Sequence, residues 1–389
     1  MMRLLFLCLI VFLTVPVTVE AKAPSALALP DVVSMDLQTF VSNSEKITKE
    51  FTDDPYLNFE VQLPKDLTER HYNVLKHYES NNRVYGEVYR KDGIAVEDVR
   101  PYFSVRAHEL SRYISAKNWF VTNLMSNNGS LRGLETDKKG DSFEALYVRF
   151  DTLGRTEVVR AKGVLKGSRV ITAEYVVPPL LWEEQRDIQT FVIKSFEFKG
   201  ALDNQNVEPL MSYSHLESFS MNYPQSWRLD TNSRDVENRI DLSFFTADEM
   251  MVVFSKIEIT LVADQSLNDP LDRSRYPTYL PQIIRERKAA IEEQGLIVGD
   301  VMERRTYDLS FEAGSQVTEI YPLRKKLTNY VTHRKAPISR EFWVTVIKGT
   351  EESGKNYIVS MIVPSRTESS AKKWALAAKA YEVMIETMR

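Results

Sequence analysis

The feature that most constrains the fold of this chain is a strand pattern that occurs once in each half. Residues 59–63 and 217–223 alternate apolar and polar side chains, and each stretch ends at a proline, Pro64 or Pro224. Alternation is typical of a β-strand with one buried face, and proline ends such a strand because it cannot donate to a ladder. Each half therefore begins its folded part in the same way.

A valine–proline pair closes the strand patterns of both halves. Val177-Pro178 and Val363-Pro364 each stand between an alternating stretch and a stretch with apolar residues on one helical face. Proline suits this boundary because it is tolerated in a first helical turn. The sequence therefore predicts an α+β fold of two tandem domains, 57–203 and 215–389, each a twisted antiparallel sheet flanked by helices. The alternative is two unrelated α+β domains that share commonplace elements.

Periodicity places further elements between these landmarks. Apolar residues three and four apart predict helices at about 107–125, 181–192, 278–294 and 374–388. Gly295 stands where the third of these helices should end. Alternation predicts strands at 143–150, 156–162, 169–177, 251–261, 305–313, 316–323, 340–348 and 356–363.

The first 21 residues have the three-part layout of a secretory signal peptide. Arg3 supplies a positive start, residues 4–15 form an apolar run, and Ala21 is a small residue at a plausible cleavage point. The alternative, an uncleaved anchor, would need an apolar run of roughly 20 residues. We therefore expect export, removal of residues 1–21, no stable membrane insertion afterwards, and a linker over residues 22–56.

Cysteine usage and charge narrow the compartment and the class of partner. The single cysteine, Cys8, lies inside the apolar run, so the expected mature chain has none. Extracellular eukaryotic domains of this size commonly use disulfides, so a cysteine-free exported chain favours a bacterial envelope, periplasmic or secreted. The formal net charge of −4 offers no basic excess to neutralise phosphates, which argues against nucleic acid as a partner.

No motif assigns a catalytic, cofactor-binding or metal-binding residue. The five histidines contain no His-x-x-x-His pair: His71, His77, His108, His215 and His333. The sequence also lacks Gly-x-Ser-x-Gly, Gly-x-Gly-x-x-Gly and Gly-Lys-Ser/Thr motifs. The adjacent acids at 53–54 and 351–352 would point to opposite sides of an extended chain and suit a solvated surface. We therefore assign no site residue and no cofactor.

Two local features are candidates for partner binding. The basic residues 324–326 and 333–335 would attract an acidic partner or anionic lipid headgroups, or would form a solvated loop. The pairs Trp119-Phe120 and Phe342-Trp343 place neighbouring rings on opposite sides of their elements. One ring of each pair is thus a candidate anchor, and core or edge packing is the alternative. Asn128-Gly129-Ser130 matches a glycosylation sequon, which matters only in a eukaryotic secretory pathway.

The start of the second half resembles a known family. Tyr223-Pro224-x-x-Trp227, together with the closing strand–proline–helix, is similar to the PsbP-like fold family, best over 217–389 and more weakly over 57–200. That family includes the extrinsic PsbP subunit of photosystem II and a small nuclear Ran-binding factor. The resemblance implies a twisted antiparallel sheet with helices on both faces and a non-catalytic role in binding or assembling proteins. No functional residue of the family maps onto this chain, so photosystem, manganese and Ran binding are not carried over.

Together these features predict an exported, non-catalytic accessory protein that binds or assembles a macromolecular partner, a protein, in a bacterial envelope. Two alternatives remain open. One is a hydrolase whose carboxylates are dispersed along the sequence, because such pairs leave no local signature. The other is a carrier of a small ligand in the groove between the two domains.

Overall fold

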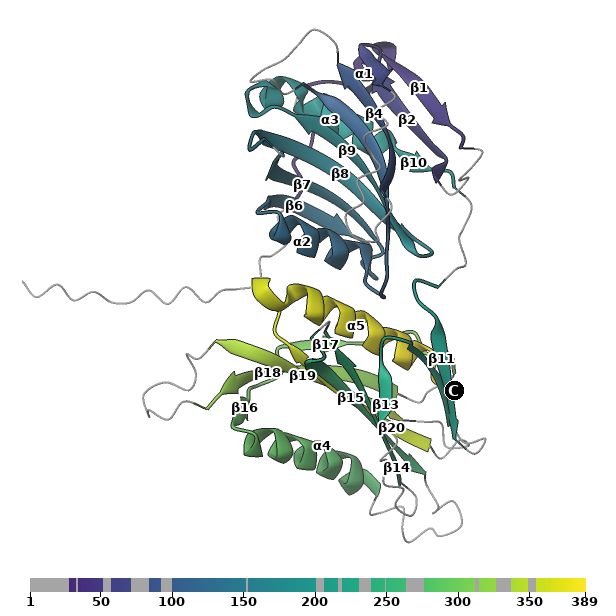
Figure 1. The fold of residues 1–389 in the computed structure, drawn as a ribbon, viewed down its shortest axis with the longest axis vertical. Helices are drawn as coiled ribbons and strands as arrows, with labels where there is room; N and C mark the ends of the chain where they lie inside the picture. The colour runs from purple at the N-terminus through teal and green to yellow at the C-terminus, as the bar shows by residue number, and fades with distance from the viewer. Residues whose placement is uncertain are drawn as a thin grey trace, which may run out of the picture.

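The structure is a computed structural model. It describes residues 28–32, 34–51, 57–70, 84–91, 100–151, 153–200, 206–215, 219–230, 239–248, 250–263, 276–311, 315–326, 337–348 and 355–389. The fold is α+β, with two sheet-rich regions that are separated by helices α2 (Ala116–Ser126) and α5 (Ala371–Glu386) (Figure 1). From one end to the other the layers are α3, the first sheet, α2, α5, the second sheet and α4 (Figure 1).

Sheet 1 contains seven antiparallel strands. In spatial order these are β3 (Leu67–Arg70), β4 (Val84–Lys91), β5 (Tyr102–Glu109), β9 (Arg169–Val177), β8 (Thr156–Lys166), β7 (Ser142–Phe150) and β6 (Ser130–Thr136). Helix α2 connects β5 to β6, and its first turn is capped by Ser115, whose Oγ accepts the Asn118 N–H at 3.4 Å. After β9 the chain turns at η3 (Pro179–Leu181) into α3 (Trp182–Ser195).

Sheet 2 is built in a corresponding order. Its main path is β13 (Arg228–Asp230), β14 (Arg239–Ala247), β15 (Val253–Ala263), β20 (Lys355–Pro364), β19 (Ile338–Lys348), β18 (Ser315–Lys325) and β16 (Leu296–Val298). The short β17 (Glu303–Arg305) also pairs with β18. Helix α4 (Tyr276–Glu293) connects β15 to β16, and α5 follows β20 through η7 (Glu368–Ser370). The connecting helices thus occur at the same points of the two strand orders.

A hairpin precedes each sheet along the chain. Strand β1 (Ser44–Lys49) pairs with β2 (Phe59–Pro64), and β2 also pairs with β10 (Glu197–Phe198), which follows α3. Strand β11 (Leu210–His215) pairs with β12 (Phe219–Pro224). After α5 the chain returns to β12, where the backbones of Ser220 and Arg389 exchange two hydrogen bonds of 3.1 and 2.9 Å.

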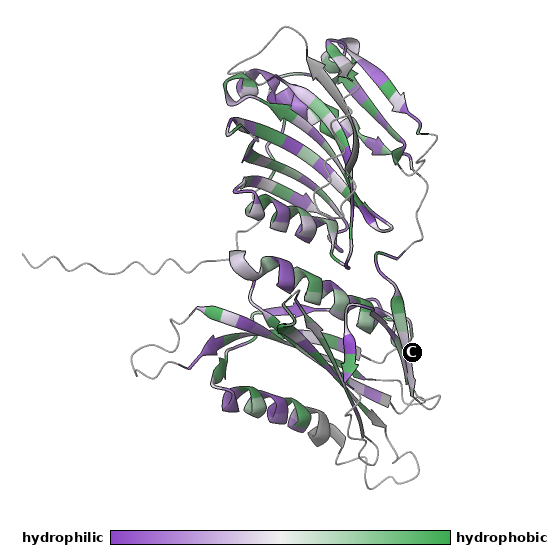
Figure 2. Ribbon diagram, viewed as in Figure 1, coloured by the Kyte–Doolittle hydropathy of each residue, from purple (hydrophilic) through white to green (hydrophobic). Residues whose placement is uncertain are grey.

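Both sheets bury apolar side chains on both faces. Apolar and polar residues alternate along many strands, as Figure 2 shows. On sheet 1, Phe103 and Tyr175 pack towards α3, whereas Phe143 packs under Phe120 of α2. On sheet 2, Trp343 packs with Tyr381, Met384 and Ile385 of α5, whereas Phe342 and Val344 pack with Ile283 and Ile291 of α4. Each sheet therefore forms the middle layer of its own core.

Three expected elements differ from the structure. The helix expected at 107–125 begins at Ala116, because residues 102–109 form β5 at the centre of sheet 1. The strand expected at 305–313 ends at Arg305. The expected linker 22–56 contains α1 (Leu37–Ser42) and β1, because Ile47 faces Val61 across the β1–β2 ladder and Phe40 is buried against Phe191. This part of the chain is therefore integral to the first region.

Among the described residues, no helix has the length and apolar character needed to cross a membrane. The expected signal peptide lies outside the described residues, and export and compartment therefore stay predictions.

Candidate functional site

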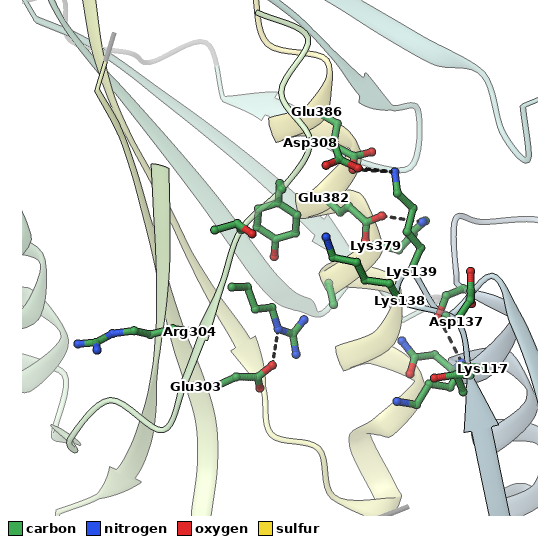
Figure 3. A pocket seen from close by; sticks show the side chains of 18 of the residues that line it. Lys117, Asp137, Lys138, Lys139, Glu303, Arg304, Asp308, Lys379, Glu382 and Glu386 are labelled. Carbon is green, nitrogen blue, oxygen red and sulfur yellow. Dashed lines mark hydrogen bonds and ion pairs between the residues drawn. The ribbon is translucent and has the colours of Figure 1, made fainter. Parts of the chain in front are cut away.

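A cleft of about 600 Å³ lies between the two sheet-rich regions. One wall is formed by the start of α2 and the β6–β7 turn, with Lys117, Lys138 and Lys139; α5 and the segment around β17 form the other (Figure 3). The second wall carries most of the acids, which are Glu303, Asp308, Glu382 and Glu386. The volume falls within the range of small-molecule sites, roughly 300–1,000 Å³.

The β6–β7 turn is fixed against the start of α2. Gly140 has φ +73°, a left-handed conformation that favours glycine, and its carbonyl accepts the Lys117 N–H at 2.9 Å. The Asp137 carboxylate accepts the Ser142 N–H at 2.9 Å, so it is used within the turn. The intervening Lys138 and Lys139 are thereby held at the mouth of the cleft.

The opposite wall takes its charges from one face of α5. Lys379, Glu382 and Glu386 are three and four residues apart, so they share a helix face. Lys379 Nζ lies 2.8 Å from Glu382 Oε1 and 3.5 Å from Asp141 Oδ1 of sheet 1. Burial raises the pKa of Glu382, and the charge of Lys379 opposes that rise.

Ion pairs connect the two walls. Lys139 Nζ lies 3.1 Å from Asp308 Oδ2 and 3.4 Å from Glu386 Oε1. The hydrogen bond from Lys139 lowers the pKa of Asp308, and the bond to Asp308 raises the pKa of Lys139. A second link is formed by the buried Glu208 carboxylate, which accepts the Tyr113 N–H at 3.2 Å and the Ser226 N–H at 2.9 Å.

The cleft collects carboxylates from distant parts of the sequence, but each already has a donor. Glu303 lies 2.5 Å from Arg305 and 2.7 Å from Arg366, and the other acids of this wall pair with lysines as described. Lys117 and Lys138 have no ion-pair partner within the described part of the chain. The walls therefore offer paired acids and two free cations, an arrangement for binding a charged group. No group of three His, Cys, Asp or Glu side chains within the described ranges is placed to hold a metal ion.

A second candidate surface is the tip of the β14–β15 hairpin. Four consecutive apolar residues are exposed there: Met250 (82%), Met251 (63%), Val252 (58%) and Val253 (50%). Asp248 holds the tip, because its Oδ1 accepts the N–H groups of Met250 (3.0 Å) and Val252 (2.9 Å). Its Oδ2 pairs with Lys373 of α5 at 2.8 Å.

The backbone of the tip is constrained. Met251 has φ +62°, which is uncommon for a residue with a side chain, and its N–H donates to the Asp248 carbonyl at 2.9 Å. The hydrogen bond from Lys373 and those from the backbone lower the pKa of Asp248, so it stays charged in its holding role. We call Met250–Val253 the apolar tip.

The residues considered from sequence lie elsewhere. His108 packs in a tilted arrangement against Trp119, with 4.7 Å between ring centroids, and burial, then the charge of Arg106, lowers the pKa of His108 to about 4. Phe342 and Trp343 lie on opposite faces of sheet 2 as expected, but both are buried, so neither is an exposed anchor. In the other pair Phe120 is buried and Trp119 is half-buried.

The remaining candidates contribute to neither surface. Arg324 and Lys325 end β18, and Lys326 follows them; Arg324 and Leu323 meet β19 at a register shift. Residues 333–335, 53–54 and 351–352, and His71 and His77, lie outside the described residues.

Sequence reasoning anticipated a groove between the two domains but assigned none of its residues, and it missed the apolar tip. The cleft draws its residues from segments near 117, 138, 305 and 380, and no local motif joins them. The apolar tip did leave a signal, since residues 250–253 interrupt the alternation that precedes and follows them.

No family model matches the chain, and no curated protein matches it. Among solved structures, it is similar to the cyanobacterial PsbP of Synechocystis, at 14% identity over 44% of this chain and 98% of that one, with a TM-score of 0.28. A Pseudomonas aeruginosa protein of unknown function, described as a putative regulator, gives 8% identity over 38% and 92% of the two chains and a TM-score of 0.22. A Bacteroides thetaiotaomicron structure gives 13% identity over 45% and 55%, with a TM-score of 0.25. These values amount to a weak fold resemblance to PsbP over part of the chain.

Proposed function

We propose that this protein is a non-catalytic, exported component of a bacterial envelope that binds a partner protein through the apolar tip. The single observation that carries the proposal is a run of four exposed apolar residues on a hairpin that Asp248 holds in one conformation. Surface apolar residues scattered singly are normal, whereas a contiguous group marks an interaction site.

The geometry of the tip suits an anchor for an apolar pocket on the partner. A loop that is already ordered loses less conformational entropy on binding than a mobile one. Methionine adapts its shape to irregular apolar surfaces, and two methionines project here. The ion pair between Asp248 and Lys373 ties this hairpin to α5, so the tip has a fixed position relative to the core of sheet 2.

The proposal includes an origin for the architecture, namely two copies of one PsbP-like unit. Its support is the correspondence of strand order and of connecting helices between sheet 1 and sheet 2. It is also supported by the two hairpins and by the return of the chain to β2 and β12 after the last helix of each half. Binding or assembly of proteins is the role that the resemblance implies.

The test is photo-crosslinking from position 251, an exposed residue of the apolar tip, in the mature protein within its native envelope fraction. We expect a crosslink to one protein that disappears in M250S/V252S, while the matched substitution L153S, at an exposed residue of the β7–β8 turn, keeps it. Both changes should leave stability within about 0.5 kcal/mol, because the residues are exposed. A crosslink only to a second copy of this chain, or the same yield in M250S/V252S, would exclude a partner at the tip.

A second candidate function is carriage of a small anionic ligand in the cleft. The specific observation is that Lys117 and Lys138 face the cleft without an ion pair in the described part of the chain. Native mass spectrometry of the protein from its own envelope would then show a bound molecule that is lost in K117Q/K138Q. The control K348Q, at an exposed position outside the cleft, should retain it.

A further inference from the structure

Three polar side chains lie together on the α2-facing side of sheet 1. Ser104 and Arg106 are two residues apart on β5, so they share a face, and Thr172 of β9 is directly opposite Arg106 in the ladder. Ser104 is fully buried and Thr172 is 3% exposed, while Arg106 is half-buried. We call these three residues the Arg106 cluster.

None of the three makes a side-chain hydrogen bond in the described part of the chain. Ser104 Oγ, Arg106 Nε and Thr172 Oγ1 are all buried atoms without a hydrogen-bond partner. A buried group left unsatisfied costs about 1–3 kcal/mol, and nearly all buried polar groups in proteins are satisfied. Three such atoms on neighbouring positions therefore lack a hydrogen-bond partner that the described chain supplies.

The neighbouring charged groups do not satisfy the cluster because they are occupied with one another. Arg149 Nε donates to Glu157 at 2.8 Å, and Arg149 Nη1 donates to Glu174 at 2.9 Å. Tyr147 donates its hydroxyl to Glu174 at 2.8 Å. The charge of Arg106 acts on Glu174 without a hydrogen bond between them. Next to Arg106 on the same face of β5, His108 packs in a tilted arrangement against Trp119.

Sheet 2 shows how the corresponding place is filled. When β9 and β20 are aligned at Pro178 and Pro364, the ladder places Thr260 at the position of Arg106 and Ser360 at that of Glu174. There Arg287 of α4 inserts its guanidinium, donating to Ser360 and, at 2.5 Å, to Thr260. Helix α2 is shorter than α4, and its only charged residue, Lys117, lines the cleft instead. In sheet 1 the corresponding arginine, Arg106, is part of strand β5, and among the described residues α2 carries no side chain that pairs with it. A partner for Arg106 therefore has to come from outside the sheet and its covering helix.

We propose that the Arg106 cluster is a binding site for the carboxylate group of a small molecule. A guanidinium presents parallel N–H donors that match a carboxylate, and the two hydroxyls supply further donors beside it. Glu174 keeps its negative charge, because the charges of Arg149 and Arg106, together with hydrogen bonds, outweigh burial and hold its pKa at about 2. A nearby fixed anion repels a second ligand charge, so the site selects a single negative charge over a phosphate dianion.

The test is a titration of the full mature protein with sodium acetate, followed by the NMR signal of the Arg106 Nε–H. Sodium chloride at matched ionic strength is the reference, and inorganic phosphate is the comparison. We expect acetate to shift the Arg106 Nε–H signal in a saturable way and phosphate to bind at least threefold more weakly. In T172V the signal should no longer reach saturation with acetate. In R106Q the acetate-dependent rise in the unfolding midpoint should disappear, whereas R132Q, at an exposed arginine on β6, should keep it.

The stability of T172V without acetate distinguishes an effect on folding from an effect on acetate binding. Without acetate, T172V removes an unsatisfied hydroxyl and should unfold no more easily than the native chain. An Arg106 signal that responds equally to chloride would overturn the proposal, as would acetate stabilisation that persists in R106Q. Tighter binding of phosphate than of acetate would overturn the assignment to a carboxylate.

Discussion

Sheet 1 and sheet 2 have corresponding strand orders but fill their interiors with different chemistry. On the helix-covered face towards α3, sheet 1 places Arg160, which donates to Glu144 and Thr190. At the aligned position sheet 2 places Trp343, which packs edge-on against Tyr381 and Trp374. The same strand positions thus carry an ion pair in one sheet and an aromatic cluster in the other.

The other faces of the two sheets also differ, again with charged residues in sheet 1 and apolar residues in sheet 2. In sheet 1, Arg149 joins Glu157 and Glu174 in a buried network, whereas the ladder aligns Arg149 with the buried Leu323 of sheet 2. The alternation of side chains between the two faces and the pairing of the strands determine the strand order. Both a polar and an apolar interior are compatible with that order. The pattern of apolar and polar residues therefore sets the fold, while the stability of each sheet depends on which residues fill its interior.

The largest expected difference is between Trp343 and Arg160. Replacing Trp343 by alanine removes a fully buried ring and should lower the free energy of unfolding by about 4 kcal/mol. Replacing Arg160 by alanine removes hydrogen bonds to a partly exposed Glu144 and should cost only about 2 kcal/mol. Urea unfolding followed by circular dichroism measures both. A larger cost for R160A than for W343A would mean that the polar sheet is the more tightly constrained one.

The next largest effect concerns Glu174 and its counterpart Ser360. In E174Q the Arg149 guanidinium loses one of its two buried carboxylates, and the free energy of unfolding should fall by about 3 kcal/mol. In S360A, Arg287 loses one hydroxyl partner but keeps Thr260, so the loss should be about 1 kcal/mol. Equal losses in the same urea titration would show that the Arg149 network contributes no more than the neutral pair.

The two sheets should also differ in their response to acid. The pKa of Glu174 is about 2 in the folded protein, below its usual 4.5, because the charges of Arg149 and Arg106 and the hydrogen bonds favour the charged form. Its stabilisation is therefore present above pH 5 and is lost as the pH falls towards 2. The loss amounts to roughly 2–3 kcal/mol. The free energy of unfolding, measured between pH 6 and 3 at roughly constant ionic strength, should fall more steeply for the native chain than for E174Q.

Alternation in the sequence predicted neighbouring strands of sheet 1, but one central strand was missed. Strands 142–150, 156–166 and 169–177 lie where alternation placed them. Residues 102–109 were missed although the apolar Phe103, Val105 and Ala107 alternate with the polar residues between them. The helix expected at 107–125 took in the end of this strand, because helical spacing was extended upstream of Ala116, where α2 begins.

Long-range pairing explains the other failures. Residues 44–49 read as part of a linker because their place depends on β2, with which they pair only after the chain turns. The cleft was anticipated as a groove between two domains, but its residues were not assigned. Lys139 and Glu386 are 247 positions apart, so only the tertiary structure brings them together. Which side chains meet there depends on how α2 rests on α5, a contact that no local spacing encodes.

The smallest expected effect tests how firmly the two sheet-rich regions are joined. Lys139 is 46% exposed and Asp308 73% exposed, so their ion pair is screened, and K139A should lower the free energy of unfolding by less than about 1 kcal/mol. That loss should vanish in about 1 M salt. The buried Glu208 carboxylate, which accepts one N–H from each region, gives the contrast, and E208A should cost about 2 kcal/mol at any salt concentration. Thermal unfolding at low and high salt distinguishes the two; a salt-independent loss in K139A would mean that Lys139 acts through packing in the cleft and not through its charge.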